Sequence, residues 1–190
     1  MNDISDDIKK SCDVLRQGGL ILYPTDTIWG IGCDATNNEA VECVYALKRR
    51  ADHKAMLVLI DSPDHLPYYV SEVPSMAWEL IALADKPLTI IYPEGRQLAP
   101  RLFGEDRSIG IRITNELFSK KLIEQFRKPL VSTSANISGM PSPASFNEIS
   151  DEVKGGVDYI VHYRRQENMK CKPSGIIRLD VDNTIQIIRK

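Results

Sequence analysis

The sequence predicts an α/β fold built on a mixed sheet. Helical and strand patterns interleave along the chain, and several strands are continuous apolar runs, which is typical of a sheet covered on both faces. The last strands follow one another without long helices, so we expect antiparallel as well as parallel neighbours. With 190 residues, of which 43% are hydrophobic, the chain suffices for one well-cored domain over residues 1–190.

The first half of the chain is predicted to alternate helices with short strands. Helices are expected where apolar residues recur every three or four positions, and strands where several apolar residues follow one another. Gly18-Gly19 ends the first helix, Pro24 halts the first strand, and Ser75 is expected to cap the last helix. The expected elements are a helix over 3–17, a strand over 20–23, a helix over 38–48, a strand over 56–60 and a helix over 75–83.

The second half is richer in strands. Apolar runs such as LTIIY and GIIRL predict them, and Asn115 is expected to cap the helix that follows SIGIRI. The expected elements are strands over 88–92 and 108–113, a helix over 115–126, a strand over 129–133, a helix over 145–153, and strands over 158–163, 175–179 and 184–189.

Charge and apolar runs argue against several classes of protein. The 24 basic and 26 acidic side chains give a formal net charge of -2, which lacks the basic excess common in nucleic-acid binders. No apolar run approaches the roughly 20 residues of a membrane span. The polar, acidic start MNDISDDIKKS is unlike a signal peptide. We therefore expect a cytoplasmic protein with no membrane contact.

Several familiar motifs are absent from the sequence. The four cysteines include no CxxC pair, and the three histidines stand far apart with no HExxH motif, so no protein-built metal site is expected. GxxxxGK[ST] and GxGxxG are also absent, which argues against a P-loop enzyme and a dinucleotide-binding fold. No GxSxG nucleophile elbow is present.

Two polar segments interrupt the apolar pattern in the first third of the chain. YPTDTIWGIGCDA follows a strand and holds two threonine hydroxyls, Thr25 and Thr27, with a carboxylate and two glycines. These residues suit close approach to a ligand, and equally a hairpin or loop with threonine and aspartate turn chemistry. LKRRADHK ends a predicted helix, where the macrodipole alone favours cations. Alternatively, its Lys48-x-Arg50 pair would clamp a polyphosphate, with lysine as a point charge and arginine as a fork.

A third polar segment, VSTSANISGMPSPAS at residues 131–145, directly follows a buried strand. Ligands gather at the carboxyl ends of strands in α/β sheets, and hydroxyls with an amide can hold phosphate oxygens or an adenosine. A serine-rich turn is the alternative interpretation. The polar side chains of this segment are Ser132, Thr133, Ser134, Asn136, Ser138 and Ser142.

Three isolated polar residues accompany later strands. Arg112 lies within SIGIRI, Ser174 precedes GIIRL, and Arg189 follows TIQII. An arginine inside an apolar strand needs a partner, because burying an unpaired charge is costly. A carboxylate or phosphate of a ligand would serve Arg112, and a structural aspartate would serve equally well.

Together and in this order, these segments resemble the YrdC family of threonylcarbamoyl-AMP synthases. PTDTIWGIGCDA is similar to the family's opening ATP and threonine loop, and SIGIRI to its arginine-bearing strand. Lys48-x-Arg50 and Ser134-x-Asn136 resemble its paired KxR and SxN signatures, and PLVSTSANISGMPS its most recognisable stretch. The resemblance covers nearly the whole chain and matches the short, single-domain form. It implies a twisted mixed sheet with flanking helices around a concave site.

The resemblance implies a nucleotidyltransferase that makes L-threonylcarbamoyladenylate and pyrophosphate from L-threonine, bicarbonate and ATP. A carbamate forms on the threonine amine, its oxygen attacks the α-phosphate, and pyrophosphate leaves. Mg²⁺ is expected with ATP, held mostly by phosphates and water. A separate tRNA threonylcarbamoyl transferase complex would then modify an adenosine beside the tRNA anticodon.

The resemblance also assigns candidate site residues. Lys48 and Arg50 are the expected catalytic pair, because positioning and charge stabilisation dominate such a reaction. Arg112 is expected to pair the threonine carboxylate as a bidentate fork. No general base is assigned, and Asp26 is only a weak candidate. The expected ATP site comprises Lys48, Arg50, Ser132, Ser134, Asn136, Ser142 and Arg189, and the expected threonine site comprises Thr25, Thr27, Arg112 and Ser174.

Two other functions stay open on the sequence. The first is an RNA-binding module, whose concave surface would hold a duplex by shape and phosphate contacts. The second is a paralogue of the same family with altered activity, such as a nucleotide hydrolase, and departures from the family pattern at Ala51, Lys86 and Gly175 motivate it. A basic run within residues 164–172 would cover ATP or touch RNA, or would be a solvated surface.

Overall fold

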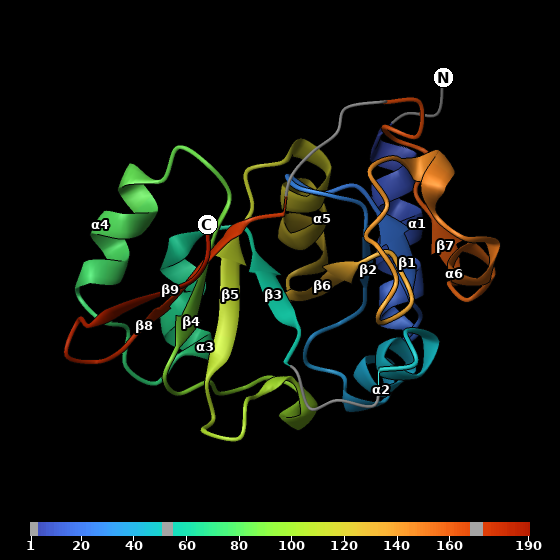
Figure 1. Cartoon of the computed structure of the whole chain (residues 1–190). Helices are drawn as coiled ribbons and strands as arrows, with labels where there is room; N and C mark the ends of the chain where they lie inside the picture. The colour runs from blue at the N-terminus through green and yellow to red at the C-terminus, as the bar shows by residue number, and fades with distance from the viewer. Residues whose placement is uncertain (1–3, 51–54, 168–172) are drawn as a thin grey trace.

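A nine-stranded mixed sheet forms the centre of the computed structural model, which describes residues 4–50, 55–167 and 173–190 (Figure 1). The strand order is β7-β1-β2-β6-β3-β5-β4-β8-β9. The pairs β1/β7, β3/β5 and β4/β8 are parallel and the other neighbours are antiparallel, which confirms the predicted mixed sheet. The strands are β1 Ile21–Tyr23, β2 Gly30–Gly32, β3 Leu57–Ile60, β4 Leu88–Tyr92, β5 Ile109–Ile113, β6 Leu130–Ser134, β7 Tyr159–Ile160, β8 Gly175–Leu179 and β9 Ile185–Arg189.

The predicted helices lie close to their expected positions, but the short helix α3 was not predicted and one expected helix is divided. The helix expected over 145–153 is divided into a 3-10 turn, Phe146–Glu148, and the short helix α6. Strand β2 lies inside the first polar segment and pairs antiparallel with β1, so this segment forms the hairpin that the sequence left open beside a loop. The helices are α1 Ile4–Arg16, α2 Asn38–Leu47, α3 Leu66–Tyr69, α4 Met76–Leu83, α5 Leu117–Phe126 and α6 Asp151–Gly155.

One predicted helix cap is wrong, and another is right in position only. Ser75 precedes α4 but makes no cap bond with its side chain. Asn183, in the turn between β8 and β9, instead accepts a hydrogen bond of 3.0 Å from the first backbone N–H of α4. Asn115 does not cap α5, because the carboxylate of Glu116 accepts the Ser119 N–H at 2.8 Å. A carboxylate is the stronger cap, since it also complements the positive end of the helix dipole.

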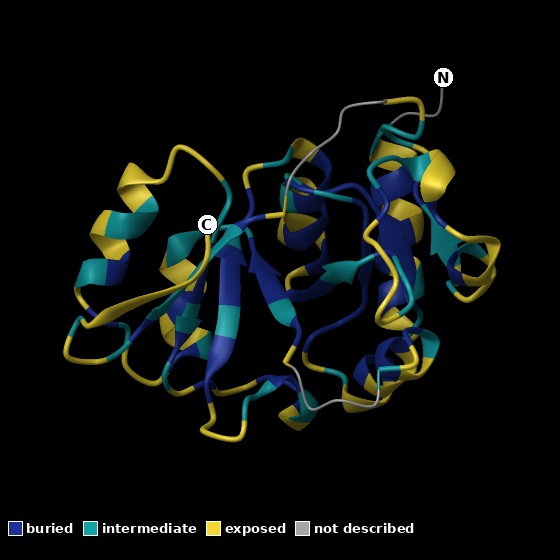
Figure 2. Cartoon of the chain, in the orientation of Figure 1, coloured by how far each residue is buried: buried dark blue, intermediate teal, exposed yellow. Residues whose placement is uncertain are grey.

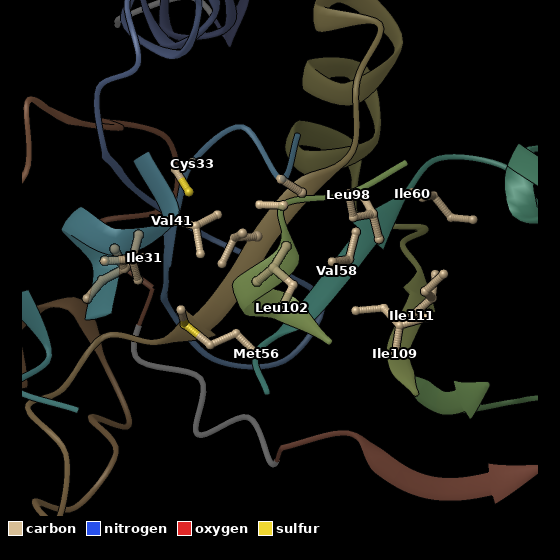
Figure 3. Close-up of a cluster of buried hydrophobic side chains, with 14 of the residues drawn as sticks. Ile31, Cys33, Val41, Met56, Val58, Ile60, Leu98, Leu102, Ile109 and Ile111 are labelled. Atoms are coloured by element: carbon tan, nitrogen blue, oxygen red, sulfur yellow. The ribbon is translucent and has the colours of Figure 1, made fainter. Parts of the chain in front are cut away.

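The two faces of the sheet belong to separate apolar clusters. Val58 and Ile60 of β3 join Ile109 and Ile111 of β5 on one face, where α2 and the loop around Leu102 pack against them (Figure 3). Helices α1 and α5 cover part of the other face and pack with β1, β3 and β6 in the second cluster. The central strands are buried and the edge strand β9 is exposed (Figure 2).

The helices α1 and α5 leave the rest of that second face open. Paired residues on neighbouring strands point their side chains to the same face. Leu59 packs with these helices and pairs with Arg112 of β5, which in turn pairs with Thr89 of β4. Arg112 and Thr89 line a cavity. One row of side chains across the sheet therefore passes from the core beneath α1 and α5 to an open site.

None of the described helices is both long and apolar enough to cross a membrane. The longest of them, α1, has 13 residues, and its exposed face carries acidic and basic side chains. A helix that buries one face and hydrates the other is typical of the surface layer of a packed domain.

We expect Gly32→Ala to lower the free energy of unfolding by about 1–3 kcal/mol, the usual cost of overpacking a core. A Cβ atom at this position would lie 2.6 Å from Tyr23 Cε1 and 2.8 Å from the Val131 carbonyl oxygen, which is part of a central strand. Gly155→Ala is the matched control, because its Cβ would meet nothing within 4 Å. Urea denaturation measures both variants, and equal losses would contradict the packing described for β2.

Candidate active site

A cavity of about 310 Å³ lies on the open part of the second sheet face. Its floor comes from strands β3, β4, β5, β6 and β8, and its rim from the loops that follow β1 and β6. The volume is of the size that small-molecule sites have. The predicted site residues that line it are Thr27, Arg50, Arg112, Ser132, Ser134, Ser142, Ser174 and Arg189.

The charges that line this cavity are positive. Arg50, Arg112 and Arg189 belong to it, and its described lining residues include no aspartate or glutamate. Burial, and then the charge of Arg112, lowers the pKa of Arg189, as expected for two cations that repel each other. An anionic ligand would relieve that repulsion and accept charge-assisted hydrogen bonds. The cavity is therefore suited to phosphate or carboxylate groups.

Arg112 pairs with a structural aspartate, one of the two kinds of partner that the sequence allowed. It also keeps one donor that no described residue accepts. Its side chain is 2% exposed, and Nη2 lies 2.9 Å from Asp26 Oδ1 and 3.4 Å from the Thr27 hydroxyl oxygen. The Nε atom is buried and has no hydrogen-bond partner among the described residues. Buried polar groups are rarely left unsatisfied in folded proteins. Because Arg112 lines the cavity, a ligand there is the natural candidate to satisfy this donor.

The two threonines of the first polar segment have different positions. Thr27 lines the cavity, but Thr25 does not. The Thr25 hydroxyl donates to the Ile28 carbonyl at 2.8 Å and accepts the Thr27 N–H at 3.0 Å. Its oxygen also lies 3.0 Å from the Thr27 hydroxyl. Thr25 therefore shapes the loop that presents Thr27, which is the turn chemistry weighed for this segment.

A cluster of polar residues closes the end of the cavity formed by β4, β8 and β9. The hydroxyls of Ser174 and Thr89 lie 2.9 Å apart, and Arg189 Nε donates to the Ser174 carbonyl at 2.9 Å. Thr89 and Ser108 also line the cavity and were missed by the sequence reasoning. Threonine is a common strand residue, so its presence in LTIIY carried no signal of a site.

Lys48 and Asn136 lie beside the cavity and do not line it. Lys48 is 2% exposed, and its Nζ donates to the carbonyls of Ser134 at 2.5 Å and Asn136 at 2.6 Å. Burial, and then the charge of Arg50, lowers the pKa of Lys48 to about 8. Asn136 Nδ2 donates to the Met140 carbonyl at 2.6 Å. The KxR and SxN segments therefore bind each other, and Lys48 holds the backbone from which Ser134 enters the cavity.

The three consecutive cations at the end of α2 point to different surroundings. Arg49 has a φ of 49°, so the backbone turns sharply between Lys48 and Arg50. As a result Lys48 points into the protein, Arg49 pairs with Glu152 at 2.5 Å on the surface, and Arg50 lines the cavity. The turn explains why the KxR spacing omits the middle residue.

The basic run at 164–172 is partly a structural feature. Its Lys170 and Lys172 lie outside the described residues, as does Ala51. Arg164 is only 17% exposed and donates to the Thr25 carbonyl at 3.1 Å, with an ion pair of 3.3 Å to Glu116. A solvated surface is therefore the wrong interpretation for Arg164, because it fastens the loop that follows β1.

The two remaining departures from the family pattern, Lys86 and Gly175, are not among the residues that line the cavity. Lys86 borders a second cavity of about 350 Å³, which is formed by residues between α4 and the sheet. Gly175 begins β8, where an added Cβ would meet only ordinary contacts at 3.8 Å. Among the described residues, no group of three or more histidine, cysteine, aspartate or glutamate side chains is placed to hold a metal ion.

Two curated bacterial proteins are similar to this chain in sequence. The threonylcarbamoyl-AMP synthase of Pseudoalteromonas translucida is 34% identical over 150 residues, which cover 77% of this chain and 80% of that protein. The protein of the same name from Vibrio parahaemolyticus is 30% identical over 174 residues, which cover 90% of this chain and 93% of that protein. Both alignments extend over most of each protein.

Solved structures of related proteins share the fold. P. abyssi Sua5 complexed with L-threonine superposes with a TM-score of 0.80 at 27% identity, over 90% of this chain and 50% of that one. This chain therefore spans about half the length of that Sua5 protein. E. coli YciO superposes with a TM-score of 0.83 at 25% identity, over 96% of this chain and 88% of that one.

A family profile provides the broadest comparison. The Sua5_yciO_yrdC profile, described as telomere recombination, matches residues 13–190. That range contains every residue that lines the cavity. The match agrees with the order of the polar segments, with the fold and with both bacterial relatives. The chain therefore belongs to the Sua5/YciO/YrdC family.

Proposed function

We propose that this chain is a threonylcarbamoyl-AMP synthase, a nucleotidyltransferase that makes L-threonylcarbamoyladenylate and pyrophosphate from L-threonine, bicarbonate and ATP. The observation that carries the proposal is a single cavity with three arginines, several hydroxyls and no acidic residue among its described lining. The carboxylate of threonine and the triphosphate of ATP both match such a lining. Two bacterial proteins of that name, 34% and 30% identical to this chain, support the proposal.

Arg112 would bind the carboxylate of threonine through Nε, which has no partner among the described residues. The Thr27 hydroxyl, 3.4 Å from Arg112, would bind beside it, and Ser174 would approach the ligand from β8. These groups would fix the amino acid so that its amine faces bicarbonate and the nucleotide. Holding reactants in one geometry is worth several orders of magnitude in rate.

Arg50 and Arg189 would bind the triphosphate, and Ser132, Ser134 and Ser142 would hold ATP through hydroxyl hydrogen bonds. The threonine amine forms a carbamate with bicarbonate, with loss of water. A carbamate oxygen then attacks the α-phosphorus, and the bond to the bridging oxygen of the β-phosphate breaks. Negative charge accumulates on the departing pyrophosphate, where the arginines stabilise it.

Lys48 and Asn136 would act on the nucleotide through the loop that carries Ser134. Lys48 Nζ contacts two backbone carbonyls and no cavity, so its proposed role is to hold this loop in place. The catalytic pair expected from the sequence thereby divides into a loop anchor, Lys48, and a phosphate-binding residue, Arg50. Fixing a loop by a buried charge rigidifies the groups attached to it.

Several further expectations complete the proposal. Mg²⁺ would enter with ATP and be held by phosphates and water, because no carboxylate is found among the described residues that line the cavity. When bound, it would offset phosphate charge. The adenylate would pass to a tRNA threonylcarbamoyl transferase complex in the cytoplasm, with residues 1–190 working as one unit.

A paralogue with altered activity is the second candidate. Its support is the departures from the family pattern at Lys86, which borders the second cavity, and at Gly175, which begins β8. Such a protein would bind ATP without threonine-dependent pyrophosphate release. An RNA-binding module has less support, because a cavity of about 310 Å³ has the size of a small-molecule site.

The first test is pyrophosphate release from ATP and bicarbonate, with and without L-threonine. We expect release only with threonine, and a loss of about 100-fold in kcat/KM for ATP in Arg50→Ala, because one phosphate-binding charge is removed. Arg49→Ala is the matched control, since this neighbour pairs with Glu152 on the surface and should stay within about twofold. Threonine-independent release, or equal losses in both variants, would contradict the proposal.

Lys48→Met separates loop anchoring from phosphate binding. The variant leaves the Ser134 and Asn136 carbonyls without their donor, so we expect a loss of about 1–3 kcal/mol in the free energy of unfolding. We expect activity to fall with it, whereas Arg50→Ala should lose activity at unchanged stability. Urea denaturation and pyrophosphate release are measured on both variants. If Lys48→Met loses ATP binding with full stability, Lys48 contacts phosphate directly.

A further inference from the structure

We propose that Asp26 is a positioning residue for the amino-acid end of the cavity, because it holds the Arg112 guanidinium so that Nε stays free for the carboxylate of the substrate. The inference rests on the proposed function and extends it to a residue outside the cavity lining. Arg112 lines the first cavity, whereas Asp26 borders the second cavity and does not line the first. It would therefore act on the substrate only through Arg112.

The geometry around Arg112 divides its nitrogen atoms between protein and ligand. Nη2 lies 2.9 Å from Asp26 Oδ1 and 3.4 Å from Thr27 Oγ1. Nε has no partner in the described part of the chain, although it is buried. An arginine with five N–H donors can satisfy an internal carboxylate and a ligand carboxylate at once. Nη2 is thus held by the protein, whereas Nε is left for a ligand.

The contact between Asp26 and Arg112 depends on charge more than on hydrogen-bond alignment. Oδ1 of Asp26 lies within ion-pair distance, yet it accepts no well-aligned hydrogen bond among the described residues. An ion pair of this kind weakens when the charge is removed, even if an oxygen stays in place. Asparagine should therefore replace Asp26 poorly, despite its equal size.

The surroundings of Asp26 keep it in position behind Arg112. Its side chain is 14% exposed, and burial raises its pKa, with Arg112 acting in the opposite direction and Glu116 adding to the rise. Arg164 pairs with Glu116 and donates to the carbonyl of Thr25, the residue before Asp26. This second arginine offsets the Glu116 charge and fastens the loop. Because Glu116 pairs with Arg164, Asp26 stays the carboxylate that pairs with Arg112.

The Asp26 charge also gives the two ends of the cavity different electrostatics. Arg50 and Arg189 have no carboxylate beside them within the described lining, whereas Arg112 is partly offset by Asp26. The nucleotide end should therefore favour polyphosphate, and the Arg112 end a single carboxylate. Without Asp26, inorganic phosphate should compete better with threonine for Arg112.

The test compares Asp26→Asn with Asp85→Asn, which removes a carboxylate that borders the second cavity without pairing with Arg112. We expect Asp26→Asn to raise the KM for L-threonine about tenfold with little change in kcat or in the KM for ATP. Asp85→Asn should match the unaltered protein. Inhibition by inorganic phosphate, competitive with threonine, should strengthen in Asp26→Asn alone.

A binding measurement adds a readout that a purely structural role would not change. L-threonine and L-threoninol, which lacks the carboxylate, are titrated by calorimetry in the presence of α,β-methylene-ATP, whose α–β bond resists cleavage. The unaltered protein should prefer threonine about tenfold or more, as expected when a buried charged donor loses its partner. In Asp26→Asn this preference should disappear, while binding of L-threoninol stays within about twofold.

Three outcomes would overturn the inference. An unchanged threonine KM and preference would make Asp26 a bystander, and a lower KM would make it a competitor of the substrate for Arg112. A large fall in kcat with unchanged KM would make it a proton acceptor in the reaction. If the unaltered protein neither binds threonine nor releases pyrophosphate with it, the proposed function itself fails. This outcome is distinct from a failure of the inference on Asp26 alone.

Discussion

The burial of Arg112 inside the sheet is the constraint on which the site depends. A guanidinium that is 2% exposed needs an opposite charge, and the loop after β1 supplies it as Asp26 at 2.9 Å. That loop is held in turn by its own threonine hydroxyls and by Arg164. Strand register then places Thr89 beside Arg112 and Leu59 on its other side. The loop after β1, the floor of the cavity and the edge of the apolar core therefore meet at the side chain of Arg112.

The two buried cations of the site differ in what remains for a ligand. Lys48 is bound by the Ser134 and Asn136 carbonyls, so its charge joins two segments of the protein. Arg112 lines the cavity and keeps a buried N–H that no described residue accepts. A satisfied cation rigidifies its neighbours, whereas an unsatisfied one gains free energy when an anion binds. A residue type alone therefore does not identify the group that contacts a substrate.

Apolar runs predicted most of the strands, and the family resemblance predicted the candidate site residues, most of which line one cavity. The sequence left β2 open as part of a hairpin or loop, since Gly30–Gly32 has the composition of a loop and pairs as a strand only through its neighbours β1 and β6. Lys48 was expected at phosphate and lies against carbonyls that only the folded loop brings near. Thr89 and the Glu116 cap likewise depend on contacts between elements, which a local pattern does not contain.

The most direct measurement is the identity of the product formed from ATP, L-threonine and ¹³C-labelled bicarbonate, determined by mass spectrometry. The account predicts an adenylate that contains threonine and one ¹³C atom, formed together with pyrophosphate, because a single cavity holds groups for a carboxylate beside groups for a triphosphate. An adenylate without the label, or hydrolysis of ATP with no threonine-containing product, would contradict the claim that both substrates react in this cavity.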